Sequence, residues 1–77
     1  MQIEVKIFST LRSSVPGSDR PLLLTLEEET TMGELIELLK IPREKVKFLF
    51  VNSRHESPSY PLKDGDHVGI FPPSGGG

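Results

Sequence analysis

The sequence predicts an α+β domain in which one main helix packs across a mixed sheet of four to five strands. Apolar residues alternate with polar ones near both ends of the chain, a central segment repeats them at helical spacing, and Gly- or Pro-containing turns separate these segments. The chain has 77 residues. A domain of this size has a small core and little room for a deep catalytic cavity, so we expect its function at the surface or at a terminus.

The first segments predict two strands joined by a turn. In QIEVKIF the apolar side chains of Ile3, Val5 and Ile7 share one face, and the polar residues between them share the other, which is typical of a half-buried strand. Residues 9–21 are rich in Ser, Pro and Gly, and we expect Leu11 to reach the core from a short helical turn over residues 10–14. The following LLLTL places Leu22, Leu24 and Leu26 on one face of a second strand, antiparallel to the first.

The helix has clear signals at both ends. Apolar residues recur at i, i+3, i+4 and i+7, namely Met32, Leu35, Ile36 and Leu39. Thr31 can cap the first turn, and Glu34 three residues later completes a capping box. Pro42 disfavours helical dihedral angles at Ile41, so we expect the helix to stop there.

Two further strands complete the predicted order of strand, strand, helix, strand, strand. VKFLFVN contains the continuous apolar run FLFV, so apolar side chains point to both faces, which predicts a strand covered on both faces. A polar connector follows, from which Tyr60 and Leu62 are expected to turn inward, and Gly65 in LKDGD predicts a turn. HVGIF is the last strand. If the first and last strands lie side by side in the centre, the fold is the β-grasp of ubiquitin-like proteins. We expect this domain to span residues 1–71 and a flexible tail to span 72–77.

Composition excludes several classes of function. The formal net charge is −2 and the basic residues are scattered, so nucleic acid is not an expected partner. The chain has no cysteine, which favours the cytoplasm and removes thiolate chemistry. The first residues lack the apolar core of a signal peptide, and the longest apolar run, FLFV, is too short to span a bilayer, so no membrane association is expected.

No catalytic or metal-binding constellation is predicted. His55 and His67 have no second ligand at metal-binding spacing, and we interpret both as surface residues. Asp64 and Asp66 flank Gly65 in what we interpret as a plain turn rather than a calcium loop. The glutamates of 27–37 are a solvated face or a contact for a basic partner. The chain is therefore not expected to be an enzyme on its own.

Two features remain as candidate functional sites. Phe8 and Phe71 end the first and last strands on the faces that do not carry the Ile and Val core, so they form either a partner-docking patch or a second half-core. The tail runs from Pro72 and Pro73 to Gly75, Gly76 and Gly77. Glycines lack Cβ and can thread a narrow slot, and six extended residues reach roughly 20 Å at about 3.3 Å each.

These segments together resemble a known family. IFSTLRSSVPG is similar to the first strand and the Phe-x-x-Leu-Arg turn of ubiquitin-like sulfur carriers of the MoaD and ThiS group, above all the molybdopterin synthase small subunit (MoaD). TTMGELIELL is similar to that family's helix entry, and FLFVNSR with PLKDGDHVGIFPP to its third and last strands. The final glycines match its terminal diglycine. The resemblance covers essentially the whole chain.

The resemblance implies a carrier function. An adenylating partner of the ubiquitin-activating type would activate the carboxylate of Gly77 with ATP, and a persulfide donor would convert it to a thiocarboxylate. The sulfur would pass to a pterin precursor bound by the large subunit of molybdopterin synthase. The chain itself would bind no cofactor and no metal, and ATP would be used by the adenylating partner.

Two departures keep alternatives open. Ser53 stands where the family often has Gly after the turn asparagine, which leaves the type of this turn open. The chain ends in three glycines, as thiamine sulfur carriers do, whereas the Leu-Arg loop and Phe-Pro-Pro favour the molybdopterin branch. The alternatives are a carrier for thiamine thiazole or another metabolite, a ubiquitin-like protein modifier, and a binding module with an inert tail.

Overall fold

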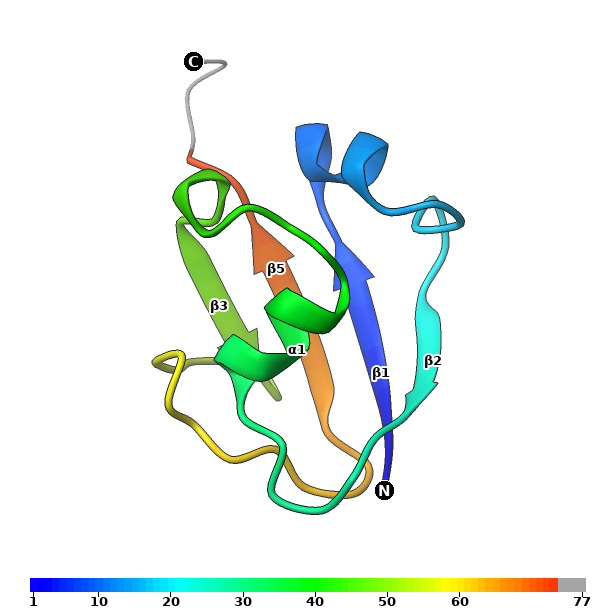
Figure 1. Cartoon of the computed structure of the whole chain (residues 1–77), viewed down its shortest axis with the longest axis vertical. Coiled ribbons are helices and arrows are strands. Elements are labelled where there is room, and N and C mark those ends of the chain that lie inside the picture. Colours follow the sequence, from blue (N-terminus) through cyan, green and yellow to red (C-terminus); the bar gives the residue numbers. More distant parts are fainter. Residues whose placement is uncertain (74–77) are drawn as a thin grey trace.

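The computed structural model describes residues 1–73. In this part of the chain one α-helix lies across a five-stranded mixed sheet (Figure 1), with the strand order β2-β1-β5-β3-β4. The elements are β1 (Gln2–Ile7), η1 (Ser9–Ser14), β2 (Leu22–Thr25), α1 (Met32–Leu38), η2 (Arg43–Lys45), β3 (Phe48–Val51), β4 (Arg54–His55) and β5 (His67–Phe71), where η marks a 3₁₀ helix. The predicted α+β class and the sheet of four to five strands are confirmed, but β4 lies in the segment predicted to be a polar connector, because a tight turn after β3 folds it back to pair with that strand.

The first and last strands pair in the middle of the sheet. β1 and β5 are parallel, with Val5 opposite Val68 and Ile7 opposite Ile70. β2 joins the other side of β1 antiparallel, and β3 joins the other side of β5 antiparallel. This arrangement is the β-grasp, so the predicted central position of the two terminal strands is confirmed.

The core lies between the sheet and α1. In β1, β3 and β5 the residues that point toward the helix are buried, as the alternating pattern predicts. Met32, Leu35 and Ile36 of α1 are completely buried against them, whereas Leu39 is only partly covered. Leu11 in η1 and Leu62 before the last turn also reach this core, as the sequence predicts. None of the helices in residues 1–73 has the length and apolar character needed to cross a bilayer.

The helix begins with the predicted capping box. The Thr31 hydroxyl accepts a hydrogen bond from the Glu34 amide at 3.2 Å, and the Glu34 carboxylate accepts one from the Thr31 amide at 2.9 Å. Two amide groups that would otherwise lack a partner at the helix start are thereby satisfied.

The predicted helix end is wrong by two residues. α1 ends at Leu38, because Lys40 adopts a left-handed conformation with φ of 61° and turns the chain back. The Lys40 amide donates to the Glu37 carbonyl at 3.0 Å and the Ile41 amide to the Ile36 carbonyl at 3.2 Å. These two bonds form a Schellman motif, which ends the helix before Pro42 can act on it.

The sequence left the type of the turn between β3 and β4 open, and the backbone angles of this turn assign it. Asn52 and Ser53 have φ of 51° and 69°, and two central residues with positive φ in a two-residue hairpin form a type I′ turn. Asn52 is held from outside the turn: its side-chain amide donates to Asp66 at 2.9 Å, and its side-chain oxygen accepts from the His67 amide at 2.9 Å. These contacts compensate for the absence of glycine at Ser53.

The prediction that β3 is covered on both faces is wrong. Leu49 and Val51 are buried toward α1, but Phe48 on the opposite face is 38% exposed and Phe50 is half-buried. No second layer lies on this side of the sheet within residues 1–73. The apolar residues on the outer face of β3 therefore belong to the molecular surface.

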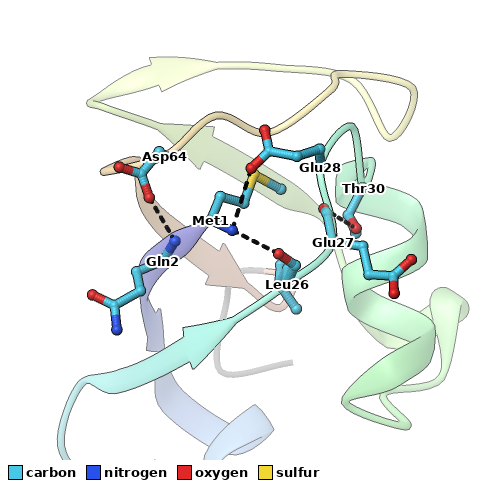
Figure 2. A network of polar contacts seen from close by, with 7 residues as sticks. All are labelled: Met1, Gln2, Leu26, Glu27, Glu28, Thr30 and Asp64. Carbon is cyan, nitrogen blue, oxygen red and sulfur yellow. Dashed lines mark hydrogen bonds and ion pairs between the residues drawn. The ribbon is translucent and has the colours of Figure 1, made fainter.

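A polar network fixes the start of β1 to the end of β2 (Figure 2). The Met1 amino group donates to the Leu26 carbonyl at 2.8 Å and lies 3.4 Å from the Glu28 carboxylate, and the Leu26 amide donates back to Met1 at 2.8 Å. The Gln2 amide donates to the Asp64 carboxylate at 2.7 Å. The start of β1 is thus tied to two loops at this end of the sheet, the one after β2 and the one before β5.

We expect Lys40→Gly to raise the free energy of unfolding by about 0.5–1 kcal/mol, because glycine adopts the left-handed conformation without the steric cost of a Cβ. Urea denaturation measures the change. Lys47→Gly is the control: Lys47 is exposed and not among the residues with positive φ, so its replacement should lower stability. A decrease for Lys40→Gly would contradict the assignment.

Candidate functional site

The outer face of the sheet is the surface opposite α1. Because side chains alternate along a strand, the residues between the buried ones all point to this face. β1 and its extension contribute Glu4, Lys6 and Phe8, β5 contributes His67, Gly69 and Phe71, and β3 contributes Phe48 and Phe50. Most of the exposed aromatic surface gathers here.

The aromatic rings on this face form one contiguous cluster, which we name the aromatic face: Phe8, Phe48, Phe50, His55 and Phe71. Phe8 and Phe71 stack with ring centroids 4.1 Å apart and planes inclined by 5°. Phe50 meets Phe71 edge-on at 5.4 Å and His55 edge-on at 5.5 Å. The predicted neighbourhood of Phe8 and Phe71 is thus observed, and Phe48, Phe50 and His55 extend it.

Gly69 creates a hollow in the middle of this face. The hollow has a volume of about 390 Å³ and is open to solvent, with Phe8, Phe50 and Phe71 among the residues around it. A Cβ at Gly69 would lie 3.3 Å from the Phe71 ring and 3.5 Å from the Phe8 ring. Glycine therefore lets the two rings lie low against the strand and leaves room for an apolar group from outside.

Charged groups border the hollow on the side away from Phe71. His67 Nδ1 lies 2.8 Å from the Glu4 carboxylate, across the parallel pair β1 and β5. Lys6 also lines the hollow. The aromatic face is therefore an apolar centre with polar groups on one side, the composition expected of a protein-binding surface rather than of a catalytic pocket.

The chain leaves the sheet beside the aromatic face. The last bond of the β3–β5 ladder runs from the Lys47 amide to the Phe71 carbonyl at 2.8 Å. Pro72 and Pro73 follow and have no N–H to continue it. They line a cleft of about 350 Å³ together with residues of η1 and η2, and these elements lie at the same end of the sheet (Figure 1). The predicted site residues Gly75, Gly76 and Gly77 lie outside the described residues.

The other candidate residues have structural surroundings. Asp66 is 6% exposed and accepts hydrogen bonds from the Lys63 amide at 2.8 Å and from Asn52. Asp64 accepts from Gln2, so the predicted turn around Gly65 is confirmed. Among residues 1–73, no cluster of three or more His, Asp or Glu side chains is arranged to hold a metal ion.

Sequence reasoning missed Phe48, Phe50 and His55 as members of the site. Phe48 and Phe50 alternate with the buried Leu49 and Val51, which indicates that they share the face of Phe8 and Phe71 once β3 is placed beside β5. His55 joins only through the tight turn that sets it opposite Phe50. A one-residue shift in that turn would have moved it to the other face.

The comparison with protein families is decisive. The model of the ThiS family matches residues 5–77. The chain belongs to the ThiS family. The resemblance to ubiquitin-like sulfur carriers of the MoaD and ThiS group is therefore confirmed. Among curated proteins, no sequence matches this ThiS-family chain significantly.

Solved structures agree with this assignment. A candidate molybdopterin converting factor subunit 1 from Pyrococcus furiosus is 31% identical, with a TM-score of 0.76, and the match covers 96% of this chain and 99% of that one. Subunits 1 and 2 of the Helicobacter pylori molybdopterin-converting factor were solved as a complex, and the matching chain is 23% identical, with a TM-score of 0.64 and full coverage of both chains. Small archaeal modifier protein 1 of Haloferax volcanii is 19% identical, with a TM-score of 0.76, covering 95% of this chain and 98% of that one. The last two likenesses show the fold alone.

We expect the stack of Phe8 on Phe71 to contribute a coupling energy of about 0.5–1.5 kcal/mol. A double-mutant cycle with Phe8→Leu and Phe71→Leu, followed by denaturant unfolding, measures it. The control cycle combines Phe8→Leu with Phe48→Leu, since Phe8 and Phe48 do not form a ring pair. A coupling no larger than that of the control would mean that the two rings are neighbours without mutual stabilisation.

Proposed function

We propose that this ThiS-family chain is the small, sulfur-carrying subunit of a molybdopterin synthase. The observation that carries this proposal is the identity of 31% over nearly the whole length to a candidate molybdopterin converting factor subunit 1. Two features of the chain support it. An exposed aromatic face offers a docking surface, and the sequence beside it continues through two prolines to three glycines. The proposed boundary between domain and tail lies between residues 71 and 72.

The proposed chemistry takes place at the main chain of Gly77. Its carboxylate attacks the α-phosphorus of ATP on a ubiquitin-activating-type partner and displaces pyrophosphate. A persulfide then attacks the acyl carbon and displaces AMP, and a thiol cleaves the resulting acyl disulfide to leave the thiocarboxylate. The chain supplies no acid, base or cofactor to these steps, and therefore we propose that it is not an enzyme by itself. The sulfur would go to a pterin precursor.

We propose that the partners share one docking surface, the aromatic face. The aromatic face lies at the root of the tail, so a partner that binds this face can receive residues 74–77 in its own active site. The Helicobacter pylori converting factor forms a complex of subunits 1 and 2, and we propose an equivalent large subunit as one partner and the adenylating enzyme as another. Both are proposed to use the aromatic face, one after the other.

The second candidate function is that of a carrier for another acceptor or of a protein modifier. The matching family model is that of the ThiS family, and the terminal triple glycine resembles thiamine carriers. The likeness to a small archaeal modifier protein supports the same fold for a modifier. All of these functions require activation at Gly77. They differ in the acceptor, which is a metabolite that receives the sulfur or a protein to which Gly77 becomes attached.

Intact-mass spectrometry distinguishes these functions. After incubation with the adenylating enzyme encoded by the same organism, ATP and a persulfide donor, we expect the chain to gain the mass of one sulfur and to lose that of one oxygen. A chain truncated after Gly76 has the same folded domain and is the control, with a strongly reduced yield of thiocarboxylate expected. A heavier adduct on lysines of other proteins instead would indicate a modifier, and an unchanged mass would contradict any carrier function.

We expect Phe50→Ala to weaken binding to the large subunit by about tenfold or more, because an aromatic anchor near the centre of an interface commonly contributes at least 1.4 kcal/mol. Isothermal titration calorimetry measures this affinity. Leu38→Ala is the matched control: Leu38 is 62% exposed on α1, remote from the aromatic face. Equal losses for both variants would exclude the aromatic face as the docking surface.

A further inference from the structure

β2 is an edge strand whose outer backbone groups are available. The amide and carbonyl groups of Leu26 pair with Met1, and antiparallel ladders alternate, so those of Leu24 and Leu22 also point to β1. The N–H and C=O groups of Leu23 and Thr25 must therefore point away from β1. Within residues 1–73 no strand lies on that side of β2, and Figure 1 shows β2 at the margin of the sheet.

The side chains of this edge are unusually apolar for an unpaired strand. Leu23 is 80% exposed on the outer face. Leu22, Leu24 and Leu26 on the inner face remain half-buried at the margin of the core. In Figure 1, α1 lies over the centre of the sheet and β2 at its margin. Protective features common on edge strands, such as a lysine, a bulge or a proline inside the strand, are absent from Leu22–Thr25.

We propose that β2 pairs antiparallel with β2 of a second copy of this chain. The two-fold axis passes between the two Leu24 residues, so that Leu23 of each copy lies opposite Thr25 of the other. Each of these pairs exchanges two backbone hydrogen bonds, since all four groups point outward. On the inner face Leu22 of one copy meets Leu26 of the other, which covers the leucines that α1 leaves half-exposed.

The backbone next to β2 fits this register and disfavours the neighbouring ones. Pro21, which has no N–H, lies opposite Glu27, whose carbonyl already accepts from the amide and the hydroxyl of Thr30 at 3.3 and 2.7 Å. Because the Glu27 carbonyl already has its hydrogen bonds, the absence of an N–H at Pro21 leaves no acceptor without a partner. The Glu27 amide can donate to the Pro21 carbonyl. If the register shifts by two residues in one direction, the Thr25 carbonyl lies opposite Pro21, which has no N–H to donate. If it shifts by two residues in the other direction, the Glu27 carbonyl, which is already occupied, must accept another hydrogen bond.

Charge is also complementary in this arrangement. Arg20, just before β2 of one copy, and Glu28, just after β2 of the other, come to the same end of the paired strands, and this occurs at both ends. Both residues are exposed, and the Glu28 side chain is 79% accessible although it lies near the Met1 amino group. Opposite charges that come close to each other at the ends of the strand pair attract. The contact is thus isologous: both copies use the same surface, with the same apolar, hydrogen-bonding and charged residues.

The proposed dimer leaves β3 and β5, which carry most of the aromatic face, unpaired with the second copy, because β1 separates β2 from β5. One strand pair buries less surface than a standard stable interface, so association should be weak and depend on concentration. It is independent of the sulfur-carrier proposal: the pairing uses neither Gly77 nor Phe8 and Phe71.

Sedimentation equilibrium of the full chain from micromolar to millimolar concentration tests the proposal. We expect a monomer–dimer equilibrium with more dimer at high concentration. Leu23→Lys should weaken dimerisation by at least tenfold, since it sets a lysine beside each strand pair. Leu38→Lys is the matched control, because it introduces the same change at another exposed leucine, on α1, and should leave dimerisation unchanged.

Amide exchange measured by NMR at low and high concentration provides the second readout. The amides of Leu23, Thr25 and Glu27 should exchange more slowly at high concentration, and those of the aromatic face should not. Thr25→Pro removes one outward N–H without removing a bond to β1 and should abolish this protection. A chain that stays monomeric at millimolar concentration, or a dimer that Leu23→Lys and Leu38→Lys affect equally, would overturn the proposal.

Discussion

The parallel pairing of β1 with β5 is the contact on which the rest of the molecule depends. It joins the two segments that are farthest apart in the sequence, and the register sets Val5 beside Val68 and Ile7 beside Ile70. On the inner face these residues form the centre of the core under α1. On the outer face the same register brings Phe8 against Phe71. One set of backbone hydrogen bonds therefore builds both the core and the candidate docking surface, and it also fixes where the chain leaves the sheet.

The two faces of the sheet differ in composition and in role. The inner face is filled by aliphatic side chains that pack at high density, and the outer face carries large rings around a glycine. An aromatic cluster without a covering layer costs solubility, and its presence in a small domain is understandable if a partner covers it. This is why the aromatic face, rather than any polar constellation, supports the proposed function. The exposed leucines of β2 are a smaller apolar surface of this kind, whose presence is likewise understandable if a partner covers it.

Several turns adopt conformations that favour glycine although other residues occupy them. Within residues 1–73, five non-glycine residues have positive φ, and they stand in or next to the connections between elements: Ser9, Glu29, Lys40, Asn52 and Ser53. Each costs conformational energy that the surrounding hydrogen bonds must exceed. At Asn52 these bonds reach Asp66 and His67, so the hairpin turn is tied directly to the start of β5. Turn geometry here is set by long-range contacts as much as by the residues of the turn.

The sequence by itself determined the type and order of the main elements β1, β2, α1, β3 and β5, because alternation and helical spacing record which side of each segment meets the core. The capping box, the inward leucines of β2 and the positions of Phe8 and Phe71 could all be predicted in this way. Only the tertiary structure decided that Lys40 ends the helix, that the outer face of β3 stays open, and that Phe48, Phe50 and His55 join the site. A local pattern tells whether a residue is apolar and which neighbours share its face. Whether another layer covers that face depends on contacts between residues distant in the chain, and no local pattern contains them.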